Sequence, residues 1–95
     1  MMKLVAISAV ALSVLAGCNS VAGRPVLVER AGPDELLKLR AGPGLGFKVV
    51  LGLPDGTPLI LRDCVTELGQ EWCRVSLANA PGVTGYVASD YLSGR

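Results

Sequence analysis

Residues 36–62 read LLKLRAGPGLGFKVVLGLPDGTPLILR, a succession of short apolar runs separated by turn-forming residues. Leucines alternate with basic residues over Leu37–Arg40, a period of two that buries one face of a strand. The loop Ala41–Gly46 is rich in glycine and proline, and the next apolar run, Phe47–Leu53, ends in a Pro-Asp-Gly turn. A third run follows at Thr57–Arg62. This stretch therefore predicts three short strands.

The residues that follow continue the pattern. The polar segment Thr66–Gln70 predicts a hairpin tip, and Trp72–Leu77 predicts a fourth strand with Trp72 on the face opposite the apolar alternation. After a loop at Ala78–Thr84, Gly85–Val87 predicts a fifth strand. Five short strands without a helix indicate an all-β fold, a small five-stranded and partly open barrel, because closure removes exposed strand edges.

The N-terminal residues have the features of an export signal. Lys3 precedes an apolar run at Leu4–Leu15, which is shorter than the roughly 20 residues that a transmembrane helix needs and suits a cleaved signal segment. The run ends in Leu15-Ala16-Gly17-Cys18, which resembles the lipobox of bacterial lipoproteins. The alternatives are an ordinary secretory signal with an incidental cysteine, or a short membrane anchor.

The lipobox resemblance implies that Cys18 is the lipid attachment site, with cleavage before it and acyl chains, typically palmitate, on its sulfur and new N-terminus. It places the protein in the bacterial cell envelope, anchored to the membrane and facing the periplasm. Asn19 is not the Asp that retains many such proteins at the inner membrane, so the outer membrane is favoured over the inner one. We therefore divide the chain into a signal peptide (1–17), a lipidated N-terminus with a flexible tether (18–33) and one domain (34–95). Within the tether, Val26–Val28 can form a short leading strand.

Charge narrows the range of partners. The 95-residue chain has 9 Lys and Arg and 8 Asp and Glu, and since Lys3 falls in the signal segment, the remainder is neutral overall. A nucleic-acid-binding protein needs a basic face that releases counterions, and a polybasic membrane-surface protein needs clustered cations. We expect neither nucleic acid as a partner nor peripheral electrostatic binding to a membrane.

Several motifs of the predicted domain, taken together, resemble the bacterial SH3-like (SH3b) domain family. The resemblance covers residues 36–92, in the order and spacing of the family. Its motifs are Leu37–Gly44, Phe47–Val50, Asp55–Thr57, Trp72–Val75 and Gly85–Leu92. It implies a barrel used for binding or targeting, often in cell-wall proteins, and a short 3₁₀ turn before Tyr91-Leu92. The chain departs from the family at Tyr86 (usually Trp), at Cys73 (usually aromatic) and in the long loop at 78–84.

Two cysteines remain when Cys18 is set aside. Cys64 ends the third predicted strand and Cys73 lies early in the fourth, so a hairpin can bring them within disulfide distance, and export favours oxidation. Two free buried thiols are the alternative. The Cys-x-x-Cys spacing of redox pairs is absent, and two cysteines without histidine are too few ligands for zinc, so we expect no metal.

The sequence has no histidine, which excludes Ser-His-Asp and Cys-His catalytic arrangements. The carboxylates are scattered without the spacing of an acid/base pair, and Gly42–Gly46 lacks the Lys-Ser/Thr of a phosphate-binding loop. We predict no enzymatic activity and no cofactor.

A binding surface is the better hypothesis. The resemblance places the aromatic residues Trp72, Tyr86 and Tyr91 near one another, where an extended peptide would stack on them, with Arg40 and Arg74 available to a carboxylate. The alternative is that these aromatics fill the edge of the core. We predict a non-catalytic envelope lipoprotein whose domain binds a peptide, peptidoglycan or an envelope protein. A structural accessory subunit of a larger envelope complex, without a ligand of its own, is the alternative function.

Overall fold

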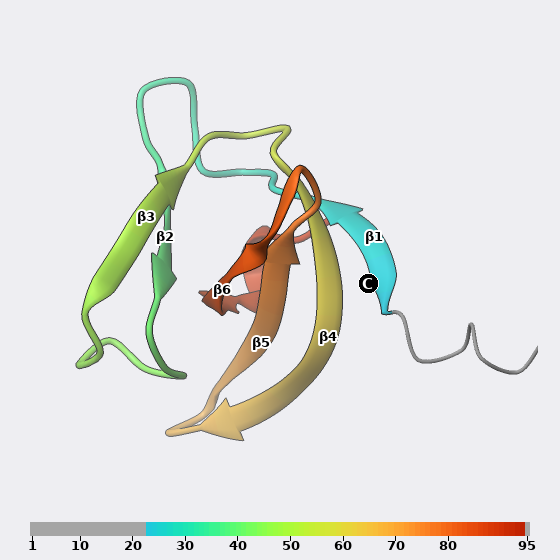
Figure 1. The fold of residues 1–95 in the computed structure, drawn as a ribbon. Coiled ribbons are helices and arrows are strands. Elements are labelled where there is room, and N and C mark those ends of the chain that lie inside the picture. The colour runs from blue at the N-terminus through green and yellow to red at the C-terminus, as the bar shows by residue number, and fades with distance from the viewer. Residues whose placement is uncertain (1–22, 95) are drawn as a thin grey trace, which may run out of the picture.

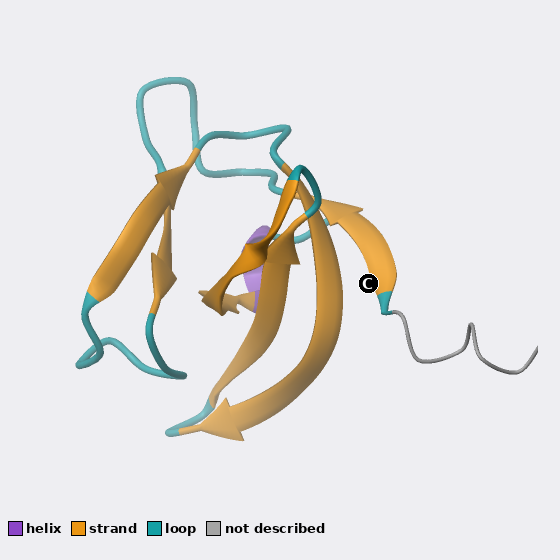
Figure 2. Cartoon of the chain, viewed as in Figure 1, coloured by secondary structure: helices purple, strands orange, loops and turns teal. Residues whose placement is uncertain are grey.

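The computed structural model describes residues 23–94. Every strand belongs to one antiparallel sheet with the order β1-β4-β5-β6-β2-β3, shown in Figures 1 and 2. Among the described residues, no helix is long and apolar enough to cross a membrane. The elements are β1 (Arg24–Leu27), β2 (Leu37–Arg40), β3 (Val49–Leu53), β4 (Pro58–Glu67), β5 (Gln70–Leu77), β6 (Ala80–Ala88) and the 3₁₀ helix η2 (Ser89–Tyr91). The all-β SH3-like fold is confirmed, and so is the short 3₁₀ turn.

The core forms where alternating side chains of the curled sheet meet. Leu37 and Leu39 of β2 are buried while Lys38 between them is exposed, as a period of two requires. In β5, Cys73 and Val75 face the core, and Trp72 does not belong to it. The buried apolar cluster consists of Val26, Val28, Leu37, Leu39, Leu53, Leu59, Cys73, Val75, Val87 and Leu92.

Residues 91–94, at the C-terminal end of the described chain, close the barrel against β1. Val28 forms an isolated bridge with Leu92, and the Ser93 amide donates to the Leu27 carbonyl oxygen at 2.9 Å. The Ser93 hydroxyl also accepts from the Leu27 amide and donates to the Leu27 carbonyl. β1 thus lies between β4 and residues 91–94, and the C-terminal end lies beside the start of β1 in Figure 1.

Among the described residues the structure has six strands where the sequence predicted five. The additional strand, β1, lies within the segment expected to be a tether and overlaps the short leading strand considered at Val26–Val28. Gly23 and Pro25 suggested an irregular chain, but Val26 and Val28 alternate and are 4% and 2% exposed. Burial of these two side chains outweighs the turn-forming composition around them.

The loop predicted at Ala78–Thr84 is shorter in the structure. β6 begins at Ala80, which pairs with Leu77, and a register irregularity between Ser76 and Leu77 accommodates the turn. Pro81 and Gly82 had suggested a loop, and they are exposed positions near the start of this strand. The predicted signal segment and Cys18 lie outside the described residues.

Candidate binding groove

The candidate site is built around Trp72, on the face of the sheet opposite the core. Trp72 pairs with Val65 of β4 and with Ala88 of β6, so these three side chains form a row across three strands. Trp72 is only 6% exposed, yet it is absent from the core cluster. It is therefore buried by segments that lie over the outer face.

The first of these segments is the loop between β2 and β3, which Arg40 holds in place. The Arg40 guanidinium donates to the carbonyl oxygens of Leu45 and Phe47 at 3.1 and 3.0 Å. The Phe47 ring packs on Gly42 so closely that a Cβ there would lie 2.5 Å from a ring carbon. These contacts fix the loop and leave Leu45 76% and Phe47 48% exposed.

The opposite wall is the tip of the β4–β5 hairpin. Leu68 and Gly69 both have positive φ, 52° and 82°, as a two-residue type I′ turn requires. A leucine in this conformation is uncommon, and its side chain is fully exposed. The tip thus presents an apolar side chain to solvent at the rim of the groove.

The groove has two compartments that share Leu45, Trp72, Ala88 and Tyr91. The wider compartment has a volume of about 590 Å³ and reaches the hairpin tip, and the smaller one, about 270 Å³, reaches β2. The wider one is also lined by Pro43, Gly44, Gly46, Phe47, Glu67, Leu68 and Gln70. The smaller one is also lined by Ala31, Glu35, Leu36, Leu37, Lys38 and Arg40. An extended chain lying across Trp72 would contact both compartments.

Three of the five residues predicted to bind a ligand line the groove: Trp72, Tyr91 and Arg40. Tyr91 comes from η2 and is 37% exposed. Tyr86 and Arg74 pair with each other in the neighbouring row of the same face, and neither lines either compartment. Of the three predicted aromatic residues, Trp72 and Tyr91 therefore line the groove together and Tyr86 lies outside it.

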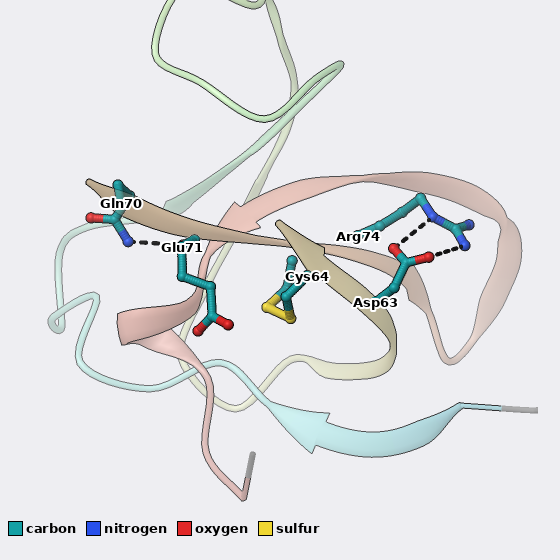
Figure 3. Close-up of a disulfide and its surroundings, with 6 residues drawn as sticks. Asp63, Cys64, Gln70, Glu71 and Arg74 are labelled. Carbon is teal, nitrogen blue, oxygen red and sulfur yellow. Dashed lines mark hydrogen bonds and ion pairs between the residues drawn. A yellow bond between two sulfur atoms is a disulfide. The ribbon is translucent and has the colours of Figure 1, made fainter. Parts of the chain in front are cut away.

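The two arginines already have partners within the chain. Arg40 holds the loop as described, and Arg74 forms a two-point pair with Asp63, with N···O distances of 3.1 and 2.9 Å, drawn in Figure 3. Hydrogen bonding to Arg74 lowers the pKa of the Asp63 carboxyl, and the same bond raises the pKa of the Arg74 guanidinium. A ligand carboxylate at Arg74 would have to compete with Asp63.

The disulfide between Cys64 and Cys73 is present, as predicted. The two residues lie directly opposite each other in β4 and β5, with Cys73 in the core. Figure 3 shows the Glu71 side chain beside the sulfur atoms, and its carboxylate oxygen lies within 4.8 Å of both. Since the sulfur atoms are bonded to each other, neither is a thiolate that could ligate a metal together with Glu71.

Comparison with known families agrees with this architecture. The profile of the bacterial SH3 domain family matches residues 35–93. The chain belongs to the bacterial SH3 domain family. No match to a curated protein or to a solved structure was found. Bacterial SH3 domains are binding modules rather than catalytic domains.

The sequence did not single out several residues that line the groove of this bacterial SH3 domain. Leu45 lies in the predicted loop Ala41–Gly46, where an apolar residue among glycines is a signal that could have been used. Phe47 was predicted to begin the second strand, but β3 begins at Val49 and leaves Phe47 in the loop. Leu68 lies at a hairpin tip that was read as polar. Glu67 is one of several scattered carboxylates, and only the fold shows that it lines the groove.

Proposed function

We propose that this protein is a non-catalytic, lipid-anchored component of the bacterial envelope whose SH3 domain binds peptides of peptidoglycan in the Trp72 groove. The observation that carries the proposal is the position of Trp72. It is buried outside the core, between two walls that expose Leu45 and Leu68, with the exposed Tyr91 of η2 lining the same groove. Buried aromatic floors with exposed apolar rims are typical of peptide-binding grooves.

The proposal includes attachment through Cys18. Its support is the apolar run and the Leu-Ala-Gly-Cys sequence that ends it. We further propose that the protein faces the periplasm from the outer membrane, since Asn19 follows the cysteine.

Sedimentation with isolated peptidoglycan tests the binding function. The protein, solubilised in mild detergent, should sediment with peptidoglycan, and Trp72→Ala should abolish this. Because Trp72 is buried, its replacement can also destabilise the fold, so Leu68→Ser serves as a second variant. The Leu68 side chain is fully exposed and can be changed without removing core contacts. Val50→Ser, on β3 and 46% exposed, is the matched control and should sediment like the unaltered protein. Equal sedimentation of all four proteins would contradict the groove as the binding site.

A second candidate function is the structural accessory subunit. The observation that favours it is β3, where Val49, Val50 and Leu51 are 40–46% exposed on a strand that pairs with β2 in the described sheet. Docking of a larger envelope protein on β3 would be weakened by Val50→Ser and not by Leu68→Ser. This pattern, measured by site-specific crosslinking from position 49 of the same strand in intact cells, would favour the accessory role.

A further inference from the structure

The two compartments of the groove differ in the kind of polar group that they offer. Among the described residues that line the wider compartment, none is basic, and the charged one is Glu67. Gln70 lines it as well, and its amide nitrogen donates to the Glu71 carbonyl oxygen at 2.9 Å. The amide oxygen of Gln70 therefore remains as an acceptor, and Gln70 pairs with Glu67 across the hairpin.

The loop wall adds no charged side chain to this end of the groove, and several of its backbone groups already have partners. Pro43 has no amide hydrogen, and the amides of Gly44 and Phe47 donate to the carbonyls of Gly42 and Gly44. The carbonyl oxygens of Leu45 and Phe47 accept from Arg40. Glu67 and Gln70 thus supply a carboxylate and an amide oxygen at this end, where Glu67 is the charged side chain among the described lining residues. Trp72 and Tyr91 add neutral N–H and O–H groups.

The smaller compartment is different because it contains cations. Lys38 and Arg40 line it together with one acid, Glu35, and Lys38 is exposed. A ligand that spans Trp72 therefore meets a negative end in one compartment and a mixed, cation-bearing end in the other. Charge complementarity then sets both what binds and its direction.

We infer that the groove recognises a peptide carrying a primary ammonium group, which lies in the wider compartment against Glu67 and the Gln70 amide oxygen while the rest of the chain crosses Trp72. An ammonium group has three donors and no acceptor, and its positive charge complements the Glu67 carboxylate, with the Gln70 amide oxygen as a further acceptor. The rings of Trp72 and Tyr91 line the same compartment and favour a cation near their faces. This inference rests on the proposed function and specifies the ligand chemistry of the same site.

The test compares native peptidoglycan with peptidoglycan whose free amines have been acetylated, a reaction that converts each ammonium into a neutral amide. The solubilised full chain should bind the acetylated material up to about five-fold more weakly, the size expected for a partly exposed charged pair. Glu67→Gln should bind native peptidoglycan as weakly as the unaltered protein binds the acetylated material. It should bind the native and acetylated preparations with the same affinity. Asp90→Asn, which removes the same charge from η2 outside both compartments, should behave like the unaltered protein.

The outcomes separate the inference from the proposed function. Trp72-dependent binding that is the same for native and acetylated peptidoglycan would overturn ammonium recognition and leave the proposed function standing. Weaker binding by Glu67→Gln that still responds to acetylation would also overturn it, because the ammonium would then lie elsewhere. Absence of binding to either preparation would overturn both.

Discussion

Cys64 and Cys73 form a cross-strand disulfide in a domain whose core is small. The bond spans a sequence separation of 9 residues, and closing a loop of this size stabilises the folded state by about 2.5–3 kcal/mol when attributed to the unfolded chain's entropy. In a Cys18→Ser background, Cys64→Ala/Cys73→Ala should lower the free energy of unfolding by that amount in urea titrations. Two alkylated thiols in the unreduced parent protein would contradict the bond.

Asp63 and Arg74 provide a pH-dependent contribution to stability. Because hydrogen bonding to Arg74 lowers the pKa of folded Asp63, the contribution is present above the unfolded pKa of about 4 and is lost as pH falls through the folded value. The melting temperature of Asp63→Asn should therefore lie slightly below that of the parent protein at about pH 7, and the difference should disappear at about pH 2. The effect is small because both side chains are exposed and solvent screens the pair.

Asp34→Asn is the control for this experiment, since it removes an exposed aspartate outside the pair. A difference between parent and Asp63→Asn that persists unchanged at low pH would show that the ion pair is not its source.

The β2–β3 hairpin, which carries the loop wall of the groove, meets the rest of the sheet at Arg40–Tyr86. Gly85 is next to this contact, and a Cβ there would lie 2.7 Å from the Arg40 carbonyl oxygen and 2.7 Å from Leu39 Cγ. Gly85→Ala should therefore destabilise the protein by about 1–3 kcal/mol, because the backbone must shift, and should weaken peptidoglycan binding by displacing the loop. Both effects are measurable on one purified variant.

Gly82→Ala is the matched control in the same strand, because nothing lies within 4 Å of a Cβ at that position. Its stability should stay close to that of the parent protein. Equal destabilisation by the two substitutions would point to a general effect of alanine in β6 rather than to the contact with β2.

Among the strands, the sequence predicted those features that side-chain periodicity and turn-forming residues determine. Alternation gave β2 and the face of β5 that enters the core, and the Pro-Asp-Gly turn separated β3 from β4. For β1 the sequence left two alternatives, a tether favoured by Gly23 and Pro25 and a short strand at Val26–Val28. Only the partners in β4 and residues 91–94 decide between them. Long-range pairing decides such a strand, and one sequence does not contain that information.

The sequence predicted those parts of the site that depend on the alternation within a single strand. Trp72 was placed on the outer face from its alternation with Cys73, and the structure agrees. Tyr86 and Arg74 lie on the same face but one row away, a distinction that depends on cross-strand register. Leu68 falls in the hairpin tip predicted at Thr66–Gln70, but that segment was taken as polar. An exposed apolar side chain at the rim of the groove was therefore not expected.

For the molecule as a whole, the position of β1 limits how far the domain can lie from its proposed anchor. The strand begins at Arg24, so five peptide units connect Cys18 to Gly23, and whatever their conformation they span at most about 18 Å. A lipid on Cys18 would therefore hold the start of β1, and with it the domain, near the bilayer.

Anchoring and binding are therefore separable by mutation. Cys18→Ser should move the protein from the membrane fraction to the soluble fraction, since stable attachment needs two or more acyl chains and the variant would have none. Released protein should still sediment with peptidoglycan, because the groove lies entirely within residues 31–91. Trp72→Ala should show the reverse behaviour, remaining in the membrane fraction while failing to bind peptidoglycan. Membrane association of Cys18→Ser would exclude the lipid anchor. The attachment would then be a retained apolar segment at Leu4–Leu15, and the proposal that the groove binds peptidoglycan would be unaffected.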